Sequence, residues 1–257
     1  MFQEINLIGL KTLYLKEVRR FIKVYNQTLI TPVVTALLFL AIFNLAINSN
    51  NHLIGDVPFA KFMAAGLIMM SVMQQSFANT SSSFIMGKVL GNIIDYLMPP
   101  LSAAEITFSM VMAGVTRGVA VGALCSITIL FFVHLQIHNF VAMIFYMVSA
   151  SMLLSILGLF TGIIAETFDQ MAAVTSYVIT PLSFLSGTFY SVADLPKFWY
   201  LISHLNPFFY MIDGFRYSVT GFHDGNLLIG AVYISITNII MWYIVQTMIK
   251  KGYRIKS

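Results

Sequence analysis

The sequence predicts an all-α integral membrane protein. We expect six transmembrane helices, an N-terminal amphipathic helix at the membrane interface, and an outer re-entrant helical hairpin between spans five and six. Charged residues make up only 9% of the chain and hydrophobic residues 58%, whereas typical soluble proteins are about 25% charged. A helix that crosses a bilayer needs roughly 20 mainly apolar residues and tolerates few ions. A water-soluble fold is excluded, because the chain has too little charge to cover its surface.

The charges that are present gather near the two ends of the chain. Of 14 Lys and Arg residues, five lie between positions 11 and 23 and four between positions 250 and 256. No Asp, Glu, Lys or Arg occurs in residues 24–55, 62–87, 118–165, 170–193 and 225–249. Basic residues that cap an apolar body are orientation signals for membrane insertion. A nucleic-acid partner is not expected, because binding would need these groups on one exposed face.

The apolar stretches predict six spans, at about 30–47, 62–77, 106–133, 140–164, 171–190 and 227–249. An even number of spans places both termini on the same side. With the ends inside, ten Lys and Arg residues are cytoplasmic, and only Lys61, Lys197 and Arg216 are outside. The positive-inside rule therefore predicts cytoplasmic termini.

We expect a single domain over residues 1–257. It consists of a cytoplasmic amphipathic helix at 7–25, a six-span bundle at 30–249 and a basic cytoplasmic tail at 250–257. A cleavable signal peptide is not expected, because the apolar stretch after position 23 runs on without a small-residue cleavage site.

Residues 7–25 predict a helix that lies along the cytoplasmic membrane surface. Its apolar residues recur at helical spacing, while Lys16, Arg19, Arg20 and Lys23 fall on another face. A solvated basic face that only fixes the topology is the alternative.

The second cytoplasmic segment, 79–105, predicts a short transverse helix before the third span. Four apolar residues lie four positions apart on one face of this helix: Ile85, Val89, Ile93 and Leu97. Pro99 ends the helix, and Ser102 with Glu105 forms a capping box for the third span. The apolar face either rests in the membrane interface or docks on a partner protein.

Small residues at helical spacing occur in two spans. The glycines are Gly114, Gly118 and Gly122 in the third span and Gly158 and Gly162 in the fourth. This spacing predicts close packing of helix backbones. 

Arg117, among these glycines, is the one formal charge deep in a predicted span. A charge at this depth needs a partner or must reach the interface. We expect a structural ion pair with Glu105, Glu166 or Asp169 in preference to a transport role.

The outer hairpin is predicted from two short apolar helices. Pro196 lies in the first turn of the first helix, and Asn206 with Pro207 breaks it. Asp213 and Arg216, three residues apart on the second helix, can pair. Exchanging the two charges is then expected to preserve the pair.

No catalytic, cofactor-binding or metal site is expected. The chain lacks the Gly-x-x-x-x-Gly-Lys-Ser/Thr phosphate loop, so ATP hydrolysis would require another chain. Its histidines show no His-Glu-x-x-His spacing, and Cys125 in an apolar run is expected to be packing. A secondary transporter or channel driven by an ion gradient is the alternative function. That class usually shows an internal repeat and an acid buried in a span, whereas all ten acidic residues here fall at or beyond the predicted span ends.

The C-terminal half carries a recognisable pattern. Three stretches resemble the signature of the ABC type-2 exporter permeases. They are Pro181-Leu182-Ser183-Phe184-Leu185-Ser186-Gly187-Thr188-Phe189-Tyr190, then Leu195-Pro196, and then Asn206-Pro207 through Tyr210, Asp213, Gly214, Phe215 and Arg216. The resemblance extends to Lys16-Glu17-Val18-Arg19-Arg20-Phe21, to residues 99–105 and to Arg117-Gly118.

This resemblance implies a six-span half-transporter in the inner membrane. Such a permease dimerises, contacts membrane lipid and pairs with two copies of a separate ATPase. It exports a drug-like, lipid or lipid-linked glycan substrate. By resemblance, the parts that touch the ATPase are the N-terminal helix, with Lys16, Arg19 and Arg20, and residues 84–98, with Ile85, Val89, Ile93 and Leu97.

Overall fold

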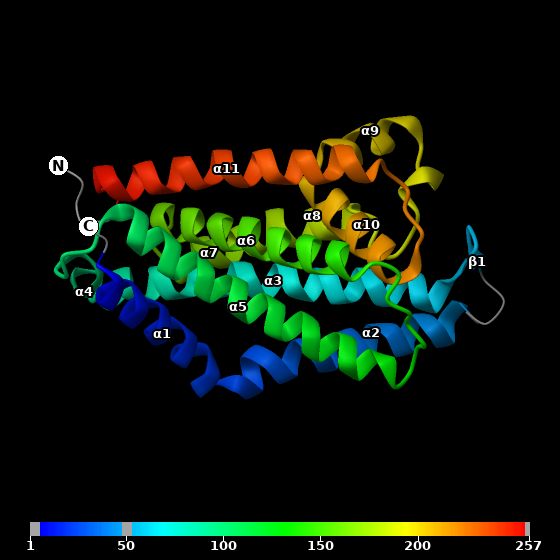
Figure 1. Cartoon of the computed structure of the whole chain (residues 1–257), viewed down its shortest axis with the longest axis horizontal. Coiled ribbons are helices and arrows are strands. Elements are labelled where there is room, and N and C mark those ends of the chain that lie inside the picture. The colour runs from blue at the N-terminus through cyan, green and yellow to red at the C-terminus, as the bar shows by residue number, and fades with distance from the viewer. Residues whose placement is uncertain (1–5, 48–52, 255–257) are drawn as a thin grey trace.

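The computed structural model describes residues 6–47 and 53–254, which form a bundle of helices along one long axis (Figure 1). The helical elements are α1 (Leu7–Lys23), η1 (Asn26–Ile30), α2 (Thr31–Ile47), α3 (Phe59–Val89), α4 (Ile94–Leu97), α5 (Ala103–Leu130), α6 (Phe140–Ile164), α7 (Phe168–Val174), η2 (Thr175–Ile179), α8 (Thr180–Leu185), η3 (Val192–Asp194), α9 (Lys197–Leu205), α10 (Pro207–Thr220) and α11 (Leu227–Lys251). A two-residue antiparallel ladder, β1 (Leu53–Ile54) with β2 (Val57–Pro58), is the one departure from an all-α chain among these residues.

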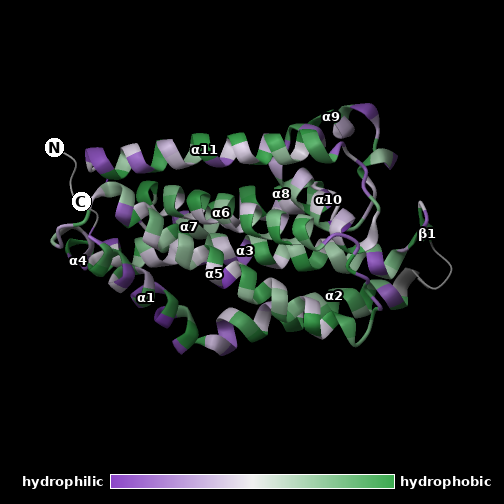
Figure 2. Ribbon diagram, viewed as in Figure 1, coloured by the Kyte–Doolittle hydropathy of each residue, from purple (hydrophilic) through white to green (hydrophobic). Residues whose placement is uncertain are grey.

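The two ends of the bundle differ. We call the end with α4, the start of α1 and the end of α11 the basic end, and the end with α9 and the β1–β2 ladder the hairpin end (Figure 1). Hydrophilic residues concentrate toward these ends and along α1, while the helices between them are mostly hydrophobic (Figure 2).

Within the described residues, four helical segments are long and apolar enough to cross a membrane: Asn26–Leu45, Ala103–Leu130, Phe140–Ile164 and Leu227–Lys251. They coincide with the first, third, fourth and sixth predicted spans. The structure thus confirms a mostly helical chain with several apolar helices.

The second predicted span is part of a longer helix at the centre of the bundle. α3 has 31 residues and packs against α2, α5, α6 and α10. Because these neighbours cover it, α3 can carry polar residues that a lipid-facing helix could not. Ser71, Ser76 and Ser81, for example, are buried and donate to the carbonyl one turn earlier.

The predicted transverse helix at 84–98 is wrong as a continuous element. α3 runs on to Val89, and the chain then turns before the four-residue α4. Gly91 adopts a φ of +73°, a left-handed conformation that glycine tolerates and a continuing helix does not.

A proline marks both π-helical segments. η1 precedes Pro32 in α2, and η2 precedes Pro181 in α8. Proline has no N–H to donate to the carbonyl one turn earlier, and its ring crowds that carbonyl, so the backbone widens locally. The fifth predicted span, 171–190, is accordingly a run of α7, η2 and α8 that ends at Leu185.

Packing divides into two hydrophobic clusters. One surrounds α3, α6 and α10 toward the hairpin end, with Met69, Leu153 and Phe215 fully buried. The other joins α1, α4, α5, α6 and α11 toward the basic end, with Leu13 and Val245 among its members. Of the predicted basic tail, residues 250–254 are described, and 255–257 lie outside the described part.

Candidate functional site

A buried carboxylate organises the basic end. Glu17 of α1 is only 1% exposed. Its Oε2 accepts hydrogen bonds from Ser83 Oγ at 2.6 Å and Arg20 Nε at 3.1 Å, and its Oε1 accepts one from Tyr96 Oη at 3.2 Å. Burial, together with the charge of Glu17, raises the pKa of Tyr96 to about 12, so this hydroxyl keeps its proton. Glu17 thereby joins α1 to α3 and to α4.

The basic residues of α1 do not act as one group. Arg20 turns inward, where Nη2 donates to the backbone oxygen of Asn79 at 2.7 Å. Lys16 Nζ lies 4.1 Å from the ring centroid of Tyr96. Arg19 is exposed and lines an open groove of about 650 Å³ along α1 together with Lys23. Of the three basic residues that the resemblance assigns to an ATPase, Arg20 is thus already bound within the chain.

The four apolar residues predicted to form one docking face are not all accessible. Ile85 is fully buried and Ile93 is 9% exposed, both inside the chain. Val89 is about half exposed. The side chain of Leu97 lies outside the described residues.

A different apolar surface lies where α3 turns into α4. We call it the α3–α4 corner, and its exposed apolar residues are Met86, Val89, Leu90, Ile94 and Met98. Sequence reasoning missed it because it assumed one uninterrupted helix. Gly91, next to the end of α3, was the signal that could have placed the turn.

Arg117 donates a hydrogen bond to a side-chain amide and not to one of the expected acids. It lies in α5, is 7% exposed, and donates from Nη2 to Oε1 of Gln75 on α3. The predicted ion pair is therefore wrong in its partners. Glu105 instead caps α5 with Ser102 and accepts a hydrogen bond from the Asn6 backbone N–H at 2.5 Å.

All five glycines predicted for packing lie where α3, α5 and α6 meet. A Cβ atom on Gly114 or Gly118 would collide with serine side chains of the neighbouring helices, and one on Gly122 with the Val72 side chain. On Gly158 it would meet the Phe77 carbonyl of α3, and on Gly162 the Cβ atom of Phe84, also on α3.

The hairpin end is organised around a buried cation. Arg216 of α10 is fully buried, and its Cζ lies 3.6 Å from the ring centroid of Phe62. Nη2 donates to the Gly187 oxygen at 2.5 Å. Nη1 lies 3.9 Å from Asp213 Oδ1 and 4.0 Å from Asp224 Oδ2. The structure thus brings Asp213 and Arg216 together and adds a second acid.

The two carboxylates also hold backbone. Asp213 accepts from the N–H groups of Asp224 at 2.7 Å and Gly225 at 2.9 Å. Asp224 in turn accepts from Ser191 Oγ at 2.7 Å and from the Val192 N–H at 3.1 Å. Sequence reasoning missed Asp224. This residue lies in the loop between α10 and α11, where no helical spacing relates it to Arg216.

The remaining predicted hairpin residues lie at helix boundaries. Pro196 precedes α9. Asn206 caps α10, whose first residue is Pro207, and its Nδ2 donates to the Leu182 oxygen at 2.9 Å. These contacts tie the start of α10 back to α8.

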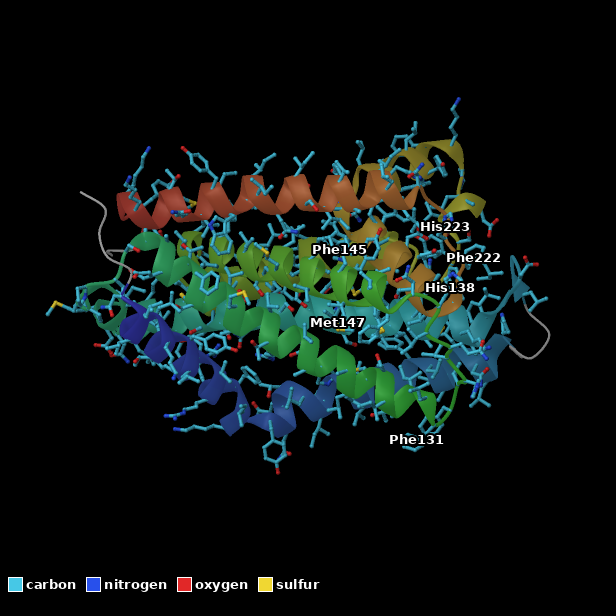
Figure 3. The ribbon with its side chains drawn as sticks, viewed as in Figure 1. Phe131, His138, Phe145, Met147, Phe222 and His223 are labelled. Carbon is cyan, nitrogen blue, oxygen red and sulfur yellow. The ribbon has the colours of Figure 1, made fainter. Side chains whose placement is uncertain are left out.

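Aromatic and histidine rings gather at the hairpin end, and Phe62, which stacks on Arg216, is one of them. The rings of Phe62 and Phe222 lie 5.9 Å apart, and Tyr217 lies 5.3 Å from His138 and 5.6 Å from His223. Figure 3 shows His138, Phe222 and His223 close together at the hairpin end. Among residues 6–47 and 53–254, no group of three or more His, Cys, Asp or Glu side chains could hold a metal ion.

Comparison with known proteins gives a family match. The protein-family model described as ABC-2 type transporter matches residues 9–220 of this chain. The inner membrane transport permease YadH of Escherichia coli (strain K12) is 40% identical over 246 residues, which cover 93% of this chain and 95% of the relative. YadH of Escherichia coli O157:H7 and of Shigella flexneri has the same identity and coverage.

Proposed function

Because this chain belongs to the ABC-2 type transporter family as a membrane transport permease, we propose that it serves an ATP-driven exporter. It works as a homodimer in the inner membrane and pairs with two copies of a separate ATPase. The chain crosses the bilayer six times, α9 and α10 form the outer re-entrant hairpin, and both termini are cytoplasmic. The basic end is then the cytoplasmic end, in agreement with the positive-inside rule.

The cargo class follows from the same resemblance. We propose a drug-like, lipid or lipid-linked glycan substrate. The bundle supports this class, because its apolar helices would not by themselves stabilise a bare, strongly anionic solute.

The observation that carries the ATPase proposal is the α3–α4 corner. Its exposed apolar side chains lie at the basic end, where α3 ends after 31 residues, more than the roughly 20 that cross a bilayer. Apolar groups gathered outside the membrane mark a protein contact. The hydrogen bonds of Glu17 fix the corner to α1. A displacement of the corner by the ATPase would therefore be transmitted to α3 at the centre of the bundle.

The test is a paired substitution on the corner. Val89→Asp with Ile94→Asp should detach the ATPase, since each buried aliphatic side chain contributes roughly 1.5–3 kcal/mol. Co-purification from membranes measures the contact. Phe131→Asp is the control, because it changes an exposed apolar residue that follows α5 at the hairpin end, away from the corner (Figure 3). If the ATPase still co-purifies with the paired variant, the contact lies elsewhere.

A further inference from the structure

An apolar cleft lies between two membrane-crossing helices at the basic end. It has a volume of about 500 Å³ and runs between α6 and α11. Phe160 and Ile164 form one wall, and Ile244 and Met248 form the other. These four side chains are apolar, so this part of the cleft suits a hydrocarbon chain.

The mouth of the cleft is cationic. Lys251, at the end of α11, lines it together with Tyr253. Arg254 follows with its Cζ 5.9 Å from the Tyr253 ring centroid, and Lys88 donates to the carbonyls that end α6 at 2.6 and 2.8 Å. Of the described residues that line the cleft, Lys251 is the charged one and none is acidic.

The depth of the cleft matches a lipid headgroup. α11 is mainly apolar and carries no charge until Lys250, so its last turn lies where hydrocarbon meets headgroups. Tyr253, which is about half exposed, lies just past the end of α11 beside the cleft, and tyrosines concentrate at this level. Basic pockets between helices on the cytoplasmic side are the arrangement that recognises anionic headgroups.

We propose that the α6–α11 cleft binds an anionic phospholipid of the inner leaflet. Its acyl chain lies between Phe160, Ile164, Ile244 and Met248, and its phosphate faces Lys251 at the mouth. The inference rests on the proposed function only in assigning the basic end to the cytoplasmic leaflet. The charge complementarity of the cleft selects this lipid over an uncharged one.

Native mass spectrometry of the purified permease tests the proposal. The protein is offered phosphatidylglycerol or phosphatidylcholine with the same acyl chains. Phosphatidylglycerol should be retained preferentially, and Lys251→Gln should weaken its binding about fivefold, the effect of one basic residue near a membrane surface. Lys11→Gln is the matched control, since it removes an exposed cation at the same end but on α1.

A second pair of variants tests the cleft without changing charge. Thr247→Trp should fill the cleft and abolish retention of phosphatidylglycerol. Leu228→Trp adds the same bulk to an exposed position at the other end of α11 and should change nothing. If Thr247→Trp lowers the thermal midpoint, Lys251→Gln still decides the question, because it changes only an exposed side chain.

Four outcomes would overturn the proposal. Equal retention of phosphatidylglycerol and phosphatidylcholine would show that charge does not select the lipid. If Lys11→Gln weakens phosphatidylglycerol binding as much as Lys251→Gln does, the attraction is a diffuse effect of the basic end and not a property of the cleft. Displacement by excess inorganic phosphate points to a bare anion site. Loss of the dimer in Thr247→Trp, with lipid binding intact, makes the cleft an interface between copies. Co-purification of the ATPase is scored on the same samples, so failure of the proposed function is seen separately.

Discussion

At the residue scale, each end of the bundle is built around one buried charge. Glu17 at the basic end and Arg216 at the hairpin end are both almost inaccessible to solvent. A buried charge is unfavourable unless it is paired and hydrogen-bonded. Each of the two charges is held by partners from other elements, so Glu17 fixes α1, and Arg216 fixes α10, to the neighbouring segments.

Removing the buried carboxylate should loosen α1. Glu17→Ala removes the acceptor that Ser83, Tyr96 and Arg20 Nε share, and a buried hydroxyl donor left unpaired costs about 1–3 kcal/mol. We expect a clear fall in the thermal midpoint of the purified permease. Asp95→Ala removes an exposed carboxylate of α4 and should leave the midpoint within error. Equal midpoints for both variants would contradict the role of Glu17.

The buried cation should not tolerate a conservative change. Arg216→Lys keeps the charge but loses the planar group that stacks on Phe62 and donates to Gly187. We expect lower thermal stability and impaired transport, whereas Lys197→Arg, the reverse change at an exposed position of α9, should have neither effect. A fully stable and active Arg216→Lys would show that charge alone suffices.

The structure also changes the expectation for a charge exchange. From spacing alone, swapping Asp213 and Arg216 should preserve the pair. However, Asp213 also accepts two backbone N–H groups from the loop after α10, and an arginine there has no acceptor to offer. We therefore expect the exchanged variant to remain impaired in a vesicle transport assay, and restored export would refute this reading.

At the element scale, α3 is the helix against which the others pack. The glycines of α5 and α6 bring those helices close to it, and the Thr80 hydroxyl of α3 donates to the Ser155 carbonyl of α6 at 2.7 Å. Within a membrane, helices associate through such close contacts and interhelical hydrogen bonds, because lipid is as apolar as their side chains.

Two glycine substitutions should therefore differ in cost. Gly158→Ala places a methyl group against the Phe77 carbonyl, and backbone cannot move aside easily. Gly122→Ala meets only the ends of Val72 and Met147 side chains, which can shift. We expect Gly158→Ala to destabilise by about 1–3 kcal/mol, and Gly122→Ala by clearly less, in reversible unfolding in detergent. The opposite ranking would contradict the packing argument.

At the scale of the whole molecule, long apolar helices pack around α3, a central helix with more polar residues. The four apolar segments that could cross a membrane are long helices, and α3 at the centre is largely covered. Arg117, on one of those segments, contacts Gln75 of α3. Among the described residues of the four segments, Glu105 is the one carboxylate, and it is engaged in capping the first turn of α5.

This arrangement predicts the energy source. A proton-coupled carrier needs a group inside the membrane that loads and releases a proton, and an arginine does not deprotonate at physiological pH. We expect transport in vesicles to follow ATP and to persist when a protonophore collapses the pH gradient. Transport that persists without ATP but stops with the gradient would favour the secondary transporter, with Glu105 the first acid to test.

The sequence by itself determined the class of protein, the helical character and the four helical segments that are long and apolar enough to cross a membrane. These follow from composition and from the length of apolar runs, which are local properties. Glycine spacing, the Ser102 capping box and the Asn206-Pro207 boundary were likewise readable, because each depends on residues within a turn or two of one another.

The tertiary structure alone decided which residues meet. Arg117 pairs with Gln75 instead of an acid, Ile85 faces the core instead of a partner, and Asp224 joins Arg216. Hydropathy and periodicity describe one helix at a time, so they cannot show which neighbours cover it. The partners of a buried charge are set by helix packing, since only a folded bundle brings distant segments within hydrogen-bonding distance.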